Sequence, residues 1–248
     1  DVDALMRGDL TEEQTRERAR RIDPVGHGRY RLYAVNPKER VVSLDDRLYA
    51  LLGTDADAAR RCTFIEWRRM MLALCREEDG LTAEEARARF GDMLTRAGID
   101  AQAVVIGQSD LREARAQLGT SMCEAVYAAR AAKLCGKAAL GARELGLYAY
   151  LFPMSENPFV CDRCRRVLSA IREYDAQNHT NLEQTALVYV KENMEIAAAA
   201  KALFQHPNTV RYRLSKIQRI MGMEDDPLFA PMLSLTVSLS RILTEEQA

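Results

Sequence analysis

A cluster of positive charge lies near the C-terminal end of the chain, between Ile196 and Met223. These 28 residues carry five basic side chains and no Asp or Glu. Such a local concentration of Lys and Arg can neutralise the phosphates of a nucleic acid, although the whole chain has a net charge of only −1. The five cations are Lys201, Arg211, Arg213, Lys216 and Arg219.

Hydrogen-bonding side chains are interspersed with these cations and could read a base sequence. An Asn amide can pair with adenine through two hydrogen bonds, and an Arg guanidinium can pair with guanine in the same way. Lys and Thr side chains can bind phosphates. The chemistry that these residue types favour is therefore recognition of DNA in its major groove.

Two short helices joined by a tight connection would position these groups. Residues 197–204 form an alanine-rich run, Gln205 and His206 follow it, and Pro207 is suited to the first turn of a second helix. Small side chains on the facing surfaces let two helices cross closely at a short turn.

The second helix is predicted to be amphipathic. Val210, Leu214, Ile217 and Met221 recur at helical spacing and form an apolar stripe that should pack inward. The same pattern also fits a solvated basic face, because helix-turn-helix pairs occur in proteins that never bind DNA. The side chains predicted to lie to the sides of the stripe or outward are Asn208, Thr209, Arg211, Tyr212, Arg213, Ser215, Lys216 and Arg219.

The run from Ala198 to Ile217 closely resembles the C-terminal helix-turn-helix of the PucR/CdaR-type regulators of purine catabolism and sugar diacids, a relative of the Fis-like DNA-binding unit. The string His-x-Asn-Thr-x-Arg-Tyr-Arg-Leu carries the resemblance, whereas Gln205 stands where an apolar residue is more usual. The DNA-binding residues that the resemblance implies are Asn208, Thr209, Arg211, Tyr212 and Arg213 on the recognition helix, with Lys201, His206 and Lys216 beside them.

The resemblance also implies the biology of the protein. We expect a cytoplasmic, sequence-specific transcriptional regulator that binds double-stranded DNA as a homodimer. Its small-molecule effector is unknown and is expected to be sensed by an upstream domain that this chain lacks. The alternatives are a residual nucleotide-binding or cyclase-like enzyme and a protein–protein adaptor.

Three further segments resemble stretches that flank the degenerate GGDEF-like domain of the same regulators. A working diguanylate cyclase needs close glycines and acidic residues at a hairpin tip, because the backbone must approach the nucleotide and the acids must hold Mg²⁺. The candidate hairpin at 62–76 has no glycine and turns near Arg68 and Arg69. We therefore predict a non-catalytic scaffold, with no catalytic residues and no cofactor. The three segments are Ala4–Glu13, Leu145–Leu151 and Arg172–Asp175.

Cys161 and Cys164 form a CxxC pair near the predicted start of a helix, where redox or zinc chemistry is conceivable. No second Cys pair or His stands at a ligand spacing, and both cysteines share an apolar stripe with Leu168 and Ile171. The pattern favours two buried structural thiols, and no metal site is predicted.

Helix-start signals and short β-rich runs set the fold class. A Ser or Thr three residues before Glu or Gln predicts helix starts at Thr11, Thr82, Ser121 and Thr180, and Gly119 and Gly136 are predicted helix ends. Strands are predicted at 29–35, 62–67, 70–75 and 101–106. The apolar runs are about six residues long, far below the roughly 18 needed to span a membrane.

These signals predict an α+β fold, a mixed domain with about four or five strands followed by an all-α helix-turn-helix domain. The predicted divisions are a helical segment at 1–27, a GGDEF-like domain at 28–152, a connecting helix at 153–179 and a DNA-binding domain at 180–248.

Overall fold

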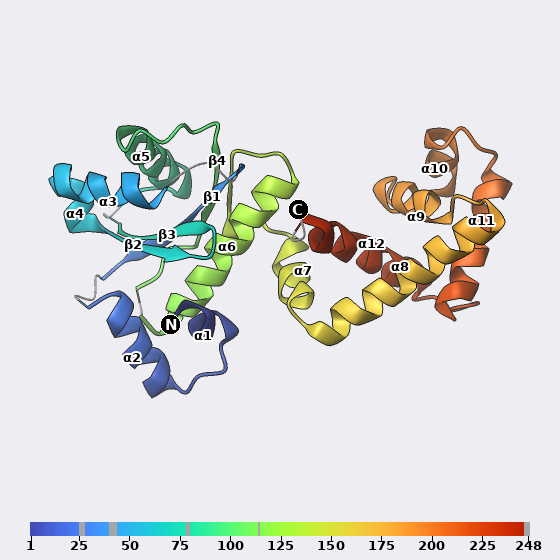
Figure 1. Cartoon of the computed structure of the whole chain (residues 1–248), viewed down its shortest axis with the longest axis horizontal. Coiled ribbons are helices and arrows are strands. Elements are labelled where there is room, and N and C mark those ends of the chain that lie inside the picture. The colour runs from blue at the N-terminus through green and yellow to red at the C-terminus, as the bar shows by residue number, and fades with distance from the viewer. Residues whose placement is uncertain (25–27, 40–43, 78–79, 114, 246–248) are drawn as a thin grey trace. The chain divides into compact units, whose positions relative to one another are not determined.

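The computed structural model describes residues 1–24, 28–39, 44–77, 80–113 and 115–245. The chain divides into two compact units, Asp1–Ala149 and Tyr150–Ala248 (Figure 1). The first is mixed α and β and the second is helical, so the predicted α+β class followed by an all-α region is confirmed. No helix in these residues is both long enough and apolar enough to cross a membrane.

The first unit contains a five-stranded sheet and six α-helices within the described residues. Its elements are α1 (Val2–Arg7), α2 (Glu12–Ile22), β1 (Tyr30–Pro37), α3 (Asp45–Thr54), α4 (Ala56–Arg61), β2 (Cys62–Trp67), β3 (Met70–Arg76), α5 (Ala83–Arg96), β4 (Val104–Gln108), α6 (Leu118–Leu134) and β5 (Ala139–Gly141). Helix α7 (Tyr148–Ser155) spans the division between the units.

The sheet has the strand order β2-β3-β1-β4-β5. Strand β1 pairs antiparallel with both β3 and β4, and β5 adds to β4 in the parallel direction. Because β1 is central, side chains on both of its faces are buried. Tyr33 and Val35 belong to a core that also contains Leu48 of α3 and Phe90 of α5. Helix α6 packs against β1, β4 and β5.

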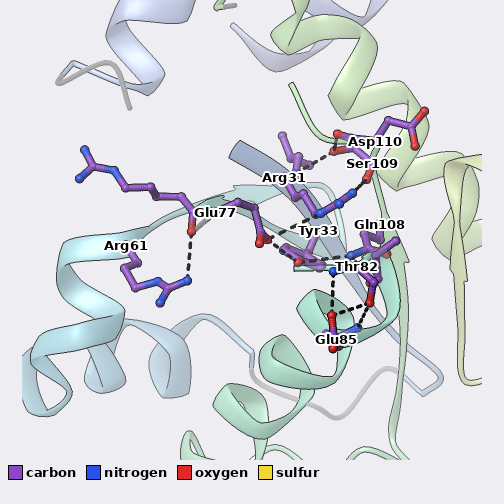
Figure 2. A network of polar contacts seen from close by, with 12 residues as sticks. Arg31, Tyr33, Arg61, Glu77, Thr82, Glu85, Gln108, Ser109 and Asp110 are labelled. Carbon is purple, nitrogen blue, oxygen red and sulfur yellow. Dashed lines mark hydrogen bonds and ion pairs between the residues drawn. The ribbon is translucent and has the colours of Figure 1, made fainter. Parts of the chain in front are cut away.

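A buried polar network joins the central strands to the start of α5 (Figure 2). The Tyr33 hydroxyl donates to Glu77 Oε1 at 3.0 Å, and Gln108 Nε2 donates to the carbonyl of Ala83 at 2.9 Å. Arg31 Nε lies 3.8 Å from Glu77 Oε1. Burial raises the pKa of Glu77 despite these partners. The network therefore has a structural role, because Tyr33, Glu77 and Gln108 form hydrogen bonds inside the protein.

Two glycines in the first unit are required by close backbone contacts. A Cβ at Gly107 of β4 would lie 1.9 Å from the carbonyl oxygen of Ala125 in α6. A Cβ at Gly119 would lie 2.2 Å from the carbonyl oxygen of Leu5 in α1. The prediction that Gly119 ends a helix was wrong, because α6 begins at Leu118 and Gly119 lets α1 approach it.

The local sequence signals had mixed outcomes. Thr11 and Thr82 form the predicted capping boxes, and Gly136 follows α6 with a φ of +65°. The helix start predicted at Ser121 was wrong, because Ser121 is buried inside α6 and donates to the carbonyl of Gln117. Residues 101–103 form a turn before β4, and β5 was not predicted.

The second unit consists of helices within the described residues. They are α8 (Pro158–Asn178), α9 (Leu182–Lys191), α10 (Ile196–Ala202), α11 (Pro207–Met221) and α12 (Phe229–Glu245). Asn157 caps α8 by accepting from the backbone of Phe159 and Val160. Ile171 of α8 lies in the same core as Leu182, Leu214 and Leu233. Helix α8 is therefore packed into this helical unit.

The start of α9 is held by Asp175 in the last turn of α8. Its carboxylate accepts from the Thr180 hydroxyl at 2.6 Å and from the backbone N–H groups of Leu182 at 2.7 Å and Glu183 at 3.0 Å. The capping role predicted for Thr180 was wrong, because its hydroxyl donates to Asp175 instead of accepting from α9. Burial raises the pKa of Asp175, but the hydrogen bonds from Thr180, Glu183 and Leu182 outweigh it and lower the pKa overall.

We expect Gly107→Ala to lower the free energy of unfolding of the first unit by about 1–3 kcal/mol or more, because the methyl group must push α6 away from β4. The chain has one Trp, at position 67, so its fluorescence in a urea titration reports this unit. Gly91→Ala in α5 is the control, because no atom beyond its chain neighbours and the adjacent backbone of its own helix lies within 4 Å of its Cβ position. That change should raise stability by about 0.5–1 kcal/mol. Equal effects of the two changes would contradict the close approach.

We expect Asp175→Ala to lower the stability of the helical unit by about 1 kcal/mol at neutral pH, because α9 loses its cap. A carboxyl with a lowered pKa in the folded state stabilises above its unfolded pKa of about 3.9 and loses that effect as the pH falls through the folded value. The deficit of the variant should therefore shrink in acid, as measured by calorimetry at several pH values. Asp162→Ala, an exposed residue of α8, is the control, and a pH-independent deficit would refute the role of the charge.

Candidate nucleic-acid interface

Helices α9, α10 and α11 form a compact group around a shared apolar core (Figure 1). Ala199 and Ala200 of α10 are buried beside α11, and their small side chains permit the close approach. The four residues of the predicted apolar stripe of α11 are all buried, so the amphipathic orientation of this helix is confirmed. They are Val210, Leu214, Ile217 and Met221.

The N-terminus of α11 is open to solvent and carries a side-chain cap. His206 Nδ1 accepts from the backbone N–H of Asn208 at 3.2 Å, and Pro207 occupies the first helical position, where no N–H is needed. The His206 and Asn208 side chains are exposed. An exposed helix N-terminus attracts phosphate, because its free N–H groups and its dipole both favour negative charge.

Four of the predicted site residues form two pairs along α11. Arg211 Nη1 donates to Asn208 Oδ1 at 2.7 Å, and both side chains are exposed. Lys216 Nζ lies 5.2 Å from the centre of the Tyr212 ring, which is 59% exposed. A guanidinium and an amide that are held together present several hydrogen-bonding groups to one ligand surface. This face can therefore bind base edges and phosphates at the same time.

The remaining predicted residues lie at the edges of this face or turn inward. Lys201 is exposed in the last turn of α10, and Thr209 is half-buried. Arg213 is half-buried, and its Nη1 donates to the hydroxyl of Thr185 in α9 at 3.2 Å. Its charge also helps to lower the pKa of Asp175. The structure therefore directs Arg213 toward the domain interior, away from Arg211.

Arg219, the fifth cation of the basic segment, forms an ion pair with Glu224 at 3.1 Å. Phe204 is absent from the predicted site residues. It lies in the turn between α10 and α11, beside the site, and is 94% exposed. An aromatic residue immediately before Gln205 and the helix start was a signal that could have been noticed.

Residues 182–235 match the family of PucR C-terminal helix-turn-helix domains. This segment is similar to PucR-type helix-turn-helix domains. A stretch of 81 residues is 31% identical to the DNA-binding transcriptional activator AdeR of Bacillus subtilis (strain 168) and covers 33% of this chain and 19% of the relative. A stretch of 111 residues is 28% identical to the proline-responsive transcriptional activator PutR of the same organism and covers 44% of this chain and 27% of the relative. The matched part is thus a minor share of either activator.

One solved structure aligns over nearly the full length. It is the crystal structure of a regulator of polyketide synthase expression from Bifidobacterium adolescentis, with 18% identity over 99% of both chains and a TM-score of 0.40. That score is too low to establish a common fold, so the PucR-type domain is assigned on residues 182–235 alone.

The two cysteines of the CxxC pair are buried at the start of α8. Cys161 Sγ donates to the carbonyl of Ser155 at 2.9 Å, and Cys164 Sγ donates to the carbonyl of Thr236 in α12 at 3.4 Å. Burial raises the pKa of the Cys164 thiol, and the neighbouring Cys161 adds to this effect. Both contacts fit packed thiols better than thiolates that would bind a metal.

We expect Arg213→Ala to lower the stability of the helical unit by about 1 kcal/mol, because the Thr185 hydroxyl loses a charged donor. Arg211→Ala is the matched control on the same helix, and its effect should stay within about 0.5 kcal/mol because that side chain is exposed. Thermal unfolding followed by circular dichroism measures both. Equal stability of the two variants would show that Arg213 has no internal structural role.

Proposed function

We propose that the chain is a sequence-specific, DNA-binding transcriptional regulator of the PucR/CdaR type, and that α11 is its recognition helix. The observation that carries the proposal is the exposed face of α11 within a PucR-type domain, where Asn208, Arg211, Tyr212 and Lys216 lie beside an open helix N-terminus. The two similar bacterial proteins are named as transcriptional activators, which supports the same role.

The dimensions of α11 suit the major groove. A helix of 15 residues is about 22 Å long, and the groove of B-DNA is about 12 Å wide and admits one helix. In this arrangement the Asn208 amide reads adenine and the Arg211 guanidinium reads guanine or binds a phosphate. Lys201, Lys216 and the α11 N-terminus bind the phosphates that border the groove.

One copy of this domain offers few contacts, so we propose that the regulator binds DNA as a homodimer. Specific binding by helix-turn-helix proteins normally uses two units that read half-sites about 34 Å apart. Arg213 bonds to Thr185 and Arg219 pairs with Glu224, whereas Arg211 bonds to Asn208 on its own exposed face. If Lys201, Arg211 and the half-buried Lys216 each neutralise one phosphate, the salt slope is about 2.7 per copy and about 5 for a dimer.

We propose that the first unit is a non-catalytic, GGDEF-like scaffold for dimer or interdomain contacts. Its β2–β3 hairpin turns at Arg68, whose guanidinium lies 4.4 Å from the centre of the Trp67 ring and 3.3 Å from Asp3. Trp67 Nε1 also donates to Asp3 at 3.1 Å. A hairpin tip that is bound to α1 in this way favours a structural role. We also propose that the regulator responds to a small-molecule effector and acts in the cytoplasm.

The test uses a duplex that the protein selects from a random-sequence pool, with binding followed by fluorescence anisotropy across a salt series. Arg211→Ala and Lys216→Ala should each weaken binding and lower the slope of log K against log salt by about 0.9 for each phosphate that is no longer neutralised. Asn208→Ala should mainly relax sequence preference, because an amide adds no charge.

Arg163→Ala is the control, since Arg163 is an exposed cation on α8. Its affinity and salt slope should match those of the parent. Full affinity and unchanged sequence preference in an Asn208/Arg211/Lys216 triple variant would refute α11 as the recognition helix.

A further inference from the structure

The turn between α10 and α11 contains an unusual residue at a strained backbone position. Phe204 has a φ of +54°, in the left-handed region that bulky side chains rarely adopt. Its backbone N–H donates to the carbonyl of Lys201, and the N–H of Gln205 donates to the carbonyl of Ala200. These two bonds form a Schellman motif, in which glycine normally occupies the left-handed position.

Glycine occupies three equivalent helix ends in the described part of the chain, and Asn193 occupies another after α9, with a φ of +54°. Gly136 after α6 and Gly222 after α11 have φ values of +65° and make the same pair of backbone bonds. Gly98 after α5 follows the same pattern with a φ of +71°. Phe204 therefore occupies a site where glycine would remove the strain.

Packing does not account for the phenylalanine. The residue is 94% exposed, the highest fraction among the large apolar residues exposed in the described part of the chain. A side chain that is both strained and solvated lowers the stability of the folded state, so its benefit must lie in an interaction outside the fold.

The position of Phe204 indicates the partner. It lies two residues before His206, the cap of α11, and three residues after Lys201. If α11 enters the major groove by its N-terminus, the preceding turn lies at the groove wall. The 5-methyl group of thymine is the apolar group that DNA displays there, and phenylalanine is one of the side chains that contact it.

We propose that the Phe204 ring packs against the 5-methyl group of a thymine and makes the regulator select thymine at one position in each half-site. This inference rests on the proposed function, because it requires α11 to bind DNA. It adds an apolar specificity contact to the polar and charged contacts of Asn208, Arg211 and Lys216.

The experiment compares wild-type protein and Phe204→Gly in two selections from the same random-sequence pool. The wild type should require thymine at one position per half-site, and the variant should lose that requirement. On the wild-type duplex, replacing that thymine by deoxyuridine removes only the methyl group. We expect affinity to fall about fourfold per half-site for the wild type, from the burial of one methyl group, and not to change for the variant.

Stability separates a DNA contact from a structural role. Phe204→Gly should raise the Tm by a few degrees, because glycine relieves the left-handed strain and little packing is removed. Phe204→Leu keeps an apolar side chain and should retain part of the thymine preference. Phe159→Ala, which removes another exposed ring at the start of α8, should change neither affinity nor preference.

The outcomes distinguish this inference from the proposed function. If Arg211→Ala weakens binding but Phe204→Gly keeps the thymine preference, the thymine contact is refuted and the recognition helix stands. If Phe204→Gly alters self-association and leaves base preference unchanged, the ring belongs to a protein interface and the contact is again refuted. If the wild type selects no duplex, both proposals fail.

Discussion

The orientation of α9 relative to α8 and α11 depends on one carboxylate, that of Asp175. It accepts from the Thr180 hydroxyl and from two backbone N–H groups at the start of α9, so the end of α8 and the beginning of α9 are held together. The positive charge of Arg213 on α11 helps to lower the pKa of the same Asp175 carboxyl. The Arg213 guanidinium also donates to the hydroxyl of Thr185, one turn into α9. Three helices therefore meet around a small polar centre at the edge of an otherwise apolar core. These contacts help to fix the orientation of α11, and with it the direction in which its exposed face points.

Helix α11 has to satisfy two demands with one sequence. Its apolar stripe must bury four side chains against α10 and the rest of the core, while the opposite face stays hydrated and available. Helical periodicity separates the two sets, and the alanines of α10 bring the partner helix close without covering the exposed face. Arg211 and Arg213 are only two residues apart, yet one bonds to Asn208 on the surface and the other to Thr185 inside. Two arginines of the same motif thus have different physical roles.

The features that the sequence predicted are those set by local spacing. The apolar stripe of α11, the capping boxes at Thr11 and Thr82 and the turn at Arg68 depend on residues within a few positions of one another. Ser121 shows the same spacing, yet its surroundings place it within a buried helix. Thr180 does not cap α9 as predicted, because Asp175 on α8 accepts the hydrogen bonds from the first backbone N–H groups of α9. Strand β5 has three residues, too few to show a pattern, and depends on its pairing with β4. Such outcomes depend on tertiary contacts that residue spacing does not encode.

Two non-glycine residues in the left-handed region show how strain can be assigned a cause. Arg68 at the β2–β3 turn has a φ of +54°, the same value as Phe204. The Arg68 guanidinium stacks on Trp67 and bonds to Asp3, so contacts within the fold offset its strain. Phe204 is 94% exposed, and its ring has little burial to offset the same backbone conformation. Because the backbone conformations match, the difference lies in the side chains. The side chain of Arg68 has its contacts within the first unit, whereas the ring of Phe204 is exposed beside α11, the helix that we propose reads DNA.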